Sequence, residues 1–451
     1  MDGTKQFLYS ILISISLISL VACQEKKETP SKVIDDTNSR FSTKGCYGQA
    51  IVNSYIVHWK NGKTTIVKNM TKDAIVAKYI SDIELENAID FIEQDRMFKF
   101  NDGIITAKQI DFQKINDLFK FNSEQAKSLD ENYFEPPAIY WGQKKTEAYS
   151  AWSENILGEG VVVAIIDSGI DIKHPQLKNQ LAINEGEIPD NWIDDDNNGL
   201  IDDYHGYDFK YNTPKIKPIG AHGTHVAGII AADPNFGPMH GVAPKAKIIP
   251  INFMSDDENS SGSLTDAISA MEYAIERKAK IVNASWGGAP CSDSLKKEID
   301  KYSENNILFI VAAGNSGVNL SNRPEYPAAF KSPSQITVGA IAPSDRMTGF
   351  SNYSSKLVDL MAPGFEIWST IPLNKYFFEA PLVYPLSGTS MAAPFVSGAA
   401  ALLWSKHPEA KAFQIKEAIL KSVDEGNYQA STKGRLNIKR ALEVLKLKNA
   451  N

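Results

Sequence analysis

Residues 160–167 read GVVVAIID, a continuous apolar run that ends in an aspartate. A strand buried on both faces of a sheet has such a sequence, because neither face carries polar side chains into solvent. Helix-like stretches such as LTDAISAMEYAIERK separate further runs, which are KIIPINF (247–253), KIVNASW (280–286) and ILFIVAAGN (307–315). Strands that alternate with helices predict an α/β fold, with a mainly parallel sheet and helices on both faces.

The composition is that of an ordinary globular protein. The chain has 451 residues, 43% of them hydrophobic and 22% charged, so it has room for one large domain with additional segments. The formal net charge of −7 gives no indication of nucleic-acid binding, which would favour a basic face. Three cysteines are too few for a disulfide framework, and whether Cys46 pairs with Cys291 stays open.

The first 45 residues are expected to be a lipoprotein leader and a tether. Residues 7–22, FLYSILISISLISLVA, have the length of a signal-peptide core and are short for a membrane span. They lead into Leu-Val-Ala-Cys23, which resembles the bacterial lipobox, so residues 1–22 would be removed and Cys23 would carry lipid. Residues 23–45 would tether an exported protein to a bacterial envelope membrane, from which processing would release it. The alternative is a simple signal peptide, or an uncleaved anchor, that happens to end in cysteine.

Two polar side chains stand where predicted strands end. Asp167 closes the first apolar run, and Asn315 closes the run that begins at residue 307. In open parallel sheets, functional residues gather at the carboxyl ends of the strands. Both residues are also common in turns, so neither one alone indicates a site.

A histidine and a serine lie near the start of two segments of small residues, which are expected to be closely packed helices. His222 lies in IGAHGTHVAGII, and Ser390 lies in SGTSMAAPFVSGAAALL. A hydroxyl at the start of a helix is either an N-cap or a nucleophile. Pro394 is expected in the first turn of its helix, where no helical hydrogen bond is lost. His225 is interpreted as structural, since the glutamate of a His-Glu-x-x-His zinc motif is missing.

Four short motifs resemble those of the subtilisin-like serine proteases and occur in the same order. They are DSGID (167–171), HGTHVAG (222–228), AAGNSG (312–317) and GTSMAAP (388–394). The segments GVAPKAKIIPI and SGSLTDAI also resemble this family. The resemblance implies a subtilisin-like fold, with a catalytic domain at residues 140–451.

The resemblance also implies roles for single residues of a serine endopeptidase that acts on polypeptides. Ser390 would attack the peptide carbonyl to form an acyl-enzyme, and His222 would take its proton and pass it to the leaving amine. Asp167 would hold the imidazole in one tautomer, while Asn315 and the Ser390 N–H would bind the oxyanion. The competing hypothesis is a surface lipoprotein that binds partners on an inactive scaffold of this family. The four intact motif residues argue against it.

By the same resemblance, two short segments would flank an extended peptide substrate and pair with its backbone by strand addition. Their residues are Ser261, Gly262, Ser263, Ser285, Trp286 and Gly287. Trp286 would either bias the pocket that receives the residue before the cut or pack in the core.

An acidic stretch between the Asp and His motifs predicts a cation site. Residues 190–203 read DNWIDDDNNGLIDD and contain six aspartates, and the spacing D-x-D-x-N-G from residue 194 matches the start of a calcium loop. The twelfth position of that loop is His205 in place of glutamate. Ca²⁺ is favoured over a solvated acidic loop, because so many like charges repel unless a cation neutralises them. The expected ligands are Asp194, Asp196, Asn198, Asp202 and Asp203.

Residues 46–139 are expected to form a smaller α+β segment before the catalytic domain. YIVHWKNGKTTIV reads as a hairpin with Asn-Gly in its turn. SDIELENAIDFIEQ (81–94) and DFQKINDLFKF (111–121) read as helices. Subtilisin-like proteases commonly carry an N-terminal propeptide that assists folding and blocks the cleft. The segment is therefore either a propeptide-like intramolecular inhibitor and chaperone or an accessory, partner-binding module.

Overall fold

A nine-stranded sheet forms the centre of the computed structural model, which describes residues 49–80, 85, 88–99, 105–106, 138–255, 261–289, 291–373 and 383–449. The strand order is β15-β16-β12-β11-β10-β9-β5-β7-β6. Neighbouring strands are parallel, except for β15 and β16, so the prediction of a mainly parallel sheet is confirmed. The strands are β5 (Val162–Asp167), β6 (Tyr207–Asp208), β7 (Lys247–Asn252), β9 (Ile281–Ala284), β10 (Leu308–Ala312), β11 (Gln335–Ile341), β12 (Leu360–Pro363), β15 (Asp424–Glu425) and β16 (Gly434–Arg435).

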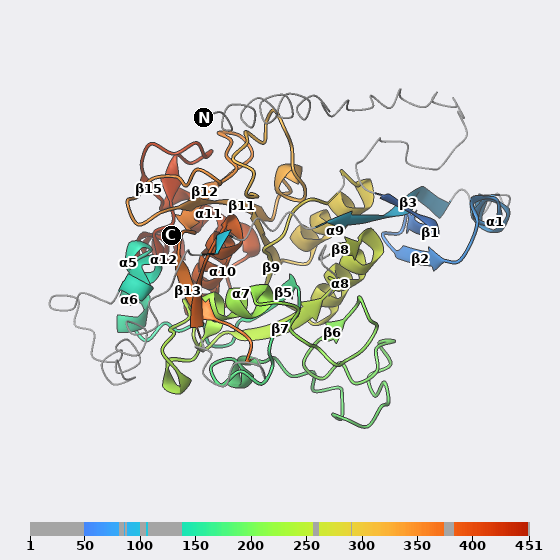
Figure 1. Ribbon diagram of the computed structural model, residues 1–451, viewed down its shortest axis with the longest axis horizontal. Helices are drawn as coiled ribbons and strands as arrows, with labels where there is room; N and C mark the ends of the chain where they lie inside the picture. The colour runs from blue at the N-terminus through green and yellow to red at the C-terminus, as the bar shows by residue number, and fades with distance from the viewer. Residues whose placement is uncertain are drawn as a thin grey trace, which may run out of the picture. The chain divides into compact units, whose positions relative to one another are not determined.

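Helices cover both faces of this sheet (Figure 1). The four that matter most for the site are α7 (His222–Ala231), α8 (Leu264–Glu276), α9 (Asp293–Glu304) and α10 (Thr389–Lys406). Val163 and Ile165 of β5 share a core with α7 and α10, whereas Ala164 and Ile166 share a second core with α8 and α9. Because successive side chains of a strand point to opposite faces, both sets are buried, which explains the continuous apolar run.

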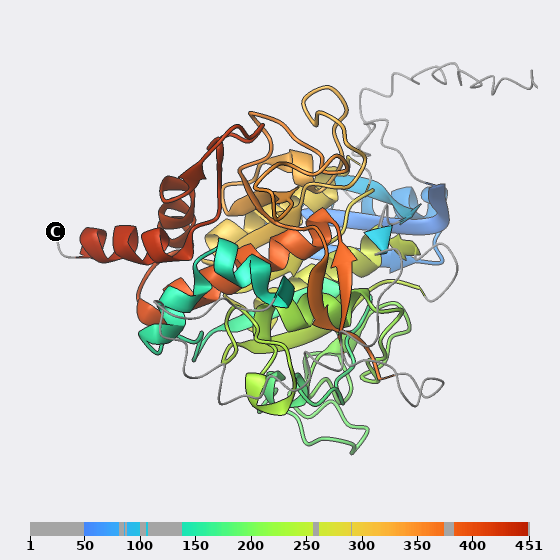
Figure 2. The same cartoon turned by 60° about the vertical axis from the view of Figure 1, so that its left-hand side comes forward.

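The chain ends in two helices, α11 (Ala412–Lys421) and α12 (Ile438–Asn449), which contact each other. Figure 2 shows them in dark red, and α12 also contacts α6. Among the residues that the structure describes, no helix is both long and apolar enough to cross a membrane. The remaining short helices are α1 (Lys72–Ile75), α5 (Trp141–Lys145), α6 (Ala148–Ser153), η1 (Val76–Ile80), η2 (Ala138–Tyr140), η3 (Lys178–Gln180), η4 (Pro234–Phe236) and η5 (Ala328–Phe330).

The N-terminal segment contributes three strands to a second, antiparallel sheet of order β2-β1-β3-β8. Strands β1 (Gln49–Trp59) and β2 (Thr64–Lys68) form the predicted hairpin. Strand β3 (Ile89–Lys99) pairs with β1 on one side and with β8 (Ser261–Ser263) on the other. A third sheet, of order β13-β14-β4, consists of β13 (Ile367–Thr370), β14 (Val383–Ser387) and β4 (Ile105–Thr106).

The helix predicted at 81–94 is wrong for its last six residues, which lie in β3. Ile89 and Ile92 are both buried, at a spacing that also suits a helix face. The pairing of β3 on both edges overrides this local pattern, because the partner strands come from distant parts of the chain. The helix predicted at 111–121 and the leader at 1–45 lie outside the described residues. Cys291 is disulfide-bonded, and its partner also lies outside them.

Candidate active site

Asp167 and His222 meet at the carboxyl end of strand β5, in the interior of the sheet. Asp167 is the last residue of β5, and His222 is the first residue of α7. The His222 Nδ1 atom lies 2.8 Å from Asp167 Oδ1, and both residues are buried. Because the carboxylate accepts, Nδ1 carries the imidazole proton, which leaves Nε2 as the basic nitrogen.

The close approach of α7 to β5 requires a small residue after the histidine. A Cβ on Gly223 would lie 2.2 Å from the Gly169 carbonyl oxygen and 3.1 Å from Asp167 Oδ1. The backbone oxygen cannot move aside as a flexible side chain would. The small residues of the motif therefore allow the helix to bring His222 against Asp167, as the sequence predicts.

Asn315 lies beside the residues that precede Ser390. Its Oδ1 accepts hydrogen bonds from the Thr389 N–H at 2.8 Å and from the Thr389 hydroxyl at 3.0 Å. With its oxygen held in this way, the amide presents Nδ2 as its donor, and a Cβ on Gly388 would lie 3.3 Å from that nitrogen. Ser390 is the second residue of α10, so its own N–H is one of the helix-end donors that lack an intrahelical acceptor. Folding thus places the Asn315 amide near the N–H of the same serine.

The Ser390 hydroxyl donates to the Ser285 carbonyl oxygen at 2.8 Å. Its proton therefore faces β9 and not the imidazole in this conformation. The hydroxyl must turn before His222 can accept that proton. Catalytic hydrogen bonds often form only when substrate is bound. Helices α7 and α10, which carry the histidine and the serine, are already in contact.

Pro394 lies inside α10, which corrects the expectation that it falls in the first turn. The helix begins at Thr389, so Pro394 is its sixth residue. An N–H at this position would bond the Ser390 carbonyl oxygen, and proline has no N–H to give. The Ser285 hydroxyl donates to that oxygen instead, at 2.9 Å.

A comparison of the chain with protein families agrees with this geometry. The model of the subtilase family matches residues 158–438. The chain belongs to the subtilase family. The major intracellular serine protease of Bacillus subtilis (strain 168) is 37% identical over 279 residues, covering 61% of this chain and 77% of that protein. Subtilisin NAT of Bacillus subtilis subsp. natto is 33% identical over 352 residues, covering 73% of this chain and 83% of that protein.

A solved structure supports the same fold. Fervidolysin from Fervidobacterium pennivorans, a keratinolytic enzyme related to subtilisin, superposes with a TM-score of 0.65 at 24% identity, covering 89% of this chain and 62% of that one. The family and its relatives show that this subtilase is a subtilisin-like serine endopeptidase.

The second histidine of the His222 motif has a structural place in this subtilase. His225 is fully buried, and its Nε2 lies 2.9 Å from the Tyr384 carbonyl oxygen. Burial lowers the pKa of His225 to about 3, so the ring is neutral and donates to that carbonyl. This contact ties α7 to β14, the strand that leads towards Ser390.

The first of the two predicted substrate segments is already paired with the chain itself. Ser261, Gly262 and Ser263 form β8, which pairs with residues 97–99 of β3. The Ser263 hydroxyl also caps α8 by accepting from the Asp266 N–H at 3.0 Å.

The second segment, Ser285 to Gly287, directly follows β9. Its Trp286 is 1% exposed, and its ring centroid lies 5.0 Å from Phe253 and 6.2 Å from Phe98 of β3. Trp286 thus packs in a core that the N-terminal segment completes.

The acidic loop brings together two of the five predicted ligands and one residue that the sequence did not single out. One carboxylate oxygen from each of Glu187, Asp194 and Asp196 lies within 4.8 Å of the others. Glu187 is 4% exposed, and its Oε2 has no hydrogen-bond partner among the described residues. Burial, with Asp203 and Asp196 nearby, raises the pKa of Glu187. A buried carboxylate oxygen without a donor fits a cation, which would satisfy it.

The other three predicted ligands make contacts of their own. Asp202 accepts from the Trp192 N–H at 2.7 Å. Asp203 forms an ion pair at 3.2 Å with Arg277, the residue that follows α8. The Asn198 amide oxygen accepts from the Leu200 N–H at 2.8 Å. Asp202 and Asp203 are outside the group of three carboxylates, whereas the Asn198 N–H donates to Asp194 Oδ1 and to Asp196 Oδ1, at 3.1 Å in each case.

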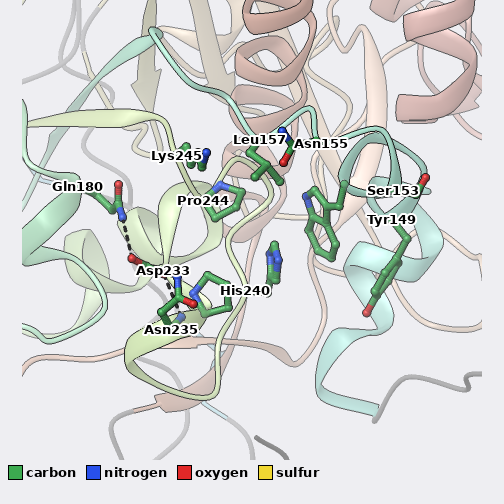
Figure 3. A pocket seen from close by; sticks show the side chains of 12 residues that line it. Tyr149, Ser153, Asn155, Leu157, Gln180, Asp233, Asn235, His240, Pro244 and Lys245 are labelled. Carbon is green, nitrogen blue, oxygen red and sulfur yellow. Dashed lines mark hydrogen bonds between the residues drawn. The ribbon is translucent and has the colours of Figure 1, made fainter. Parts of the chain in front are cut away.

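A separate pocket of about 480 Å³ lies among residues that the motifs do not include. Figure 3 shows Asp233, Asn235 and His240 on one side of it and Tyr149 on the other. The His240 ring stacks on Trp152 with 3.6 Å between the ring centroids, and burial lowers the pKa of His240 to about 4. None of its lining residues is among the predicted site residues, so the pocket is distinct from the predicted catalytic site.

Proposed function

We propose that Ser390, His222 and Asp167 act as nucleophile, general base and orienting carboxylate in peptide-bond hydrolysis, with Asn315 in the oxyanion hole. The 2.8 Å contact between the imidazole and the carboxylate carries this proposal. It is supported by the contact between α7, which begins with the histidine, and α10, which begins beside the serine.

The reaction needs two proton transfers, and one imidazole provides both. As the Ser390 oxygen bonds to the peptide carbonyl carbon, Nε2 of His222 takes the hydroxyl proton. The developing oxyanion receives hydrogen bonds from the Asn315 amide and the Ser390 N–H, aided by the helix dipole of α10. The imidazolium then gives its proton to the leaving amine as the C–N bond breaks, and water hydrolyses the acyl-enzyme by the same steps in reverse.

A serine-directed sulfonyl fluoride tests this assignment. Purified protein is expected to hydrolyse casein, to lose that activity on treatment, and to carry one sulfonyl group on the peptide that contains Ser390, as located by mass spectrometry. Label on another serine, with activity lost, would reject Ser390 as the nucleophile. Untreated protein without casein activity, measured after its N-terminal segment is removed, would favour the inactive binding scaffold.

The N-terminal segment is proposed to be an intramolecular inhibitor of the cleft. Its strand β3 occupies the edge of β8, which is the edge proposed for substrate. Its strand β4 pairs with residues 386–387 of β14, just before Ser390. The match to subtilisin NAT covers 73% of this chain, which is more than residues 140–451 contain. Part of the match therefore lies in the N-terminal segment.

Two carboxylates of β3 attach the segment to the catalytic domain. Asp95 accepts from the Thr265 N–H at 3.1 Å, at the start of α8. Glu93 accepts from the Ser294 N–H at 2.9 Å, at the start of α9. Both acceptors are buried, and each neutralises the positive end of a helix dipole. Figure 1 shows β3 next to these two helices.

Removal of both carboxylates should release the cleft. In the full-length chain, Glu93→Ala with Asp95→Ala is expected to raise the initial rate of casein hydrolysis about tenfold, since charge-assisted hydrogen bonds to helix ends are lost. Asp73→Ala is the matched control, because Asp73 is an exposed acid of the same segment. An unchanged initial rate in the double variant, with the segment still present, would contradict the inhibitor role.

The acidic loop is proposed to hold a structural Ca²⁺ through Glu187, Asp194 and Asp196. Binding to the folded state alone stabilises it by mass action, so EGTA is expected to lower the apparent Tm by about 3 °C. Glu187→Gln should already show the lower Tm and respond little to EGTA. Asp190→Asn is the control, because Asp190 is exposed in the same loop and outside the cluster. An EGTA-independent wild-type Tm would exclude the site.

Attachment through lipid on Cys23 remains a proposal from the sequence, and so do the leader at 1–22, the tether at 23–45 and the envelope location. The proposal rests on the apolar run and the lipobox-like residues before Cys23. Cys23→Ser is expected to move the protein from the membrane fraction to the soluble fraction of its host, and unchanged fractionation would reject lipid anchoring.

A further inference from the structure

Ser285 and Ser390 exchange hydrogen bonds in a reciprocal pair. The Ser390 hydroxyl donates to the Ser285 carbonyl oxygen at 2.8 Å, and the Ser285 hydroxyl donates to the Ser390 carbonyl oxygen at 2.9 Å. Both residues are buried, so water does not compete for these bonds. The pair joins the end of β9 to the first turn of α10.

One of these two bonds replaces a missing helical bond. In an α-helix the carbonyl of residue i accepts from the N–H of residue i+4, and for Ser390 that residue is Pro394. Proline leaves this buried carbonyl without its donor, which is costly unless another group supplies one. The Ser285 hydroxyl is that group.

Asn283 fixes the direction in which the Ser285 hydroxyl points. Asn283 is a fully buried amide in the otherwise apolar strand β9. Its Nδ2 donates to Ser285 Oγ at 2.9 Å, and its Oδ1 accepts from the Ser397 hydroxyl at 2.8 Å. Because Ser285 Oγ accepts from the amide, its own proton is left for the Ser390 carbonyl. The chain of bonds thus runs from the third turn of α10, through β9, and back to the first turn.

We propose that Ser285, oriented by Asn283, is a positioning residue that holds the main chain of the nucleophile Ser390. The proposal rests on the assignment of Ser390 as nucleophile. The Ser390 hydroxyl must turn from β9 to the imidazole during the reaction, while the Ser390 N–H must stay in place to bind the oxyanion. The hydrogen bond from Ser285 to the Ser390 carbonyl holds the main chain in place during that rotation. It does so at the carbonyl that Pro394 leaves without a helical donor.

Ser285→Ala tests the proposal through the split between kcat and KM. It removes the donor and leaves two buried groups unpaired, so kcat is expected to fall about tenfold. KM for a peptide substrate should change less than about twofold, because the Ser285 main chain proposed to face substrate is kept. The rate of inactivation by a sulfonyl fluoride should fall in parallel with kcat. A rise in KM alone would overturn the positioning role.

Pro394→Ala supplies the decisive double variant, because it restores an N–H to the helix at the required position. In the background of Ser285→Ala, it is expected to recover most of the lost kcat, and the two effects should therefore be non-additive. Additive losses would overturn the proposal. Ser405→Ala is the control, since it removes a hydroxyl that donates to the Leu402 carbonyl of the same helix, outside this chain of bonds, and its kcat should stay near that of the wild type. Full activity in Ser390→Ala would instead refute the nucleophile assignment itself.

Discussion

Asp167→Asn is expected to lower kcat by about 10⁴ with KM little changed, as for loss of the orienting carboxylate in other serine proteases. The asparagine fits the same space, so the effect is chemical and not one of packing. Asp167 Oδ1 accepts from His222 and from both the N–H and the hydroxyl of Ser168, the N–H at 2.7 Å. A neutral amide no longer stabilises the imidazolium that forms when His222 takes a proton.

The matched control for this variant is Ser168→Ala, which removes one hydrogen bond to the carboxylate and keeps its charge. It is expected to cost far less in kcat. Initial rates on a chromogenic peptide, with thermal melting to show that each variant is folded, make the comparison. If Asp167→Asn and Ser168→Ala lost similar activity, the charge of Asp167 would not be the feature that matters.

The central sheet can be predicted from the sequence because the feature that marks each strand, its apolar run, lies within the strand itself. Each strand of the core is buried on both faces, as Val163 and Ala164 show, so its apolar run is visible without knowledge of its neighbours. Asp167 likewise ends a strand that can be located from its own residues. Strand β3 has no such signal, because its partners β1 and β8 lie far away in the sequence.

The residues of the candidate site also differ in how far the local sequence reveals them. The four motif residues can be located because glycines and other small residues surround them for steric reasons, as at Gly223. Glu187 was missed because it precedes the acidic stretch, and only folding brings its carboxylate to Asp194 and Asp196. The one local feature that could have pointed to Glu187 is that it directly follows the turn-forming residues Asn-Glu-Gly. The role of Ser285 could not be predicted, because it depends on which hydrogen bond Pro394 omits.

Asn315→Ala is expected to lower kcat by about 10²–10³, a range taken from a subtilisin that lost its oxyanion-hole asparagine. KM should change little, because the oxyanion exists only after the carbonyl is attacked. The alanine variant also removes the acceptor of the two Thr389 hydrogen bonds, so part of its effect is structural.

Asn315→Asp separates the two contributions. The carboxylate keeps an oxygen where Thr389 donates, at 2.8 Å and 3.0 Å, and replaces the amide donor by a second oxygen. That oxygen repels a developing oxyanion, so kcat should fall at least as far as in Asn315→Ala, although the contacts to Thr389 survive. Ser316→Ala, at the exposed neighbouring position, is the control. If Asn315→Asp kept wild-type kcat, the amide would be holding Thr389 in place and would not be binding the oxyanion.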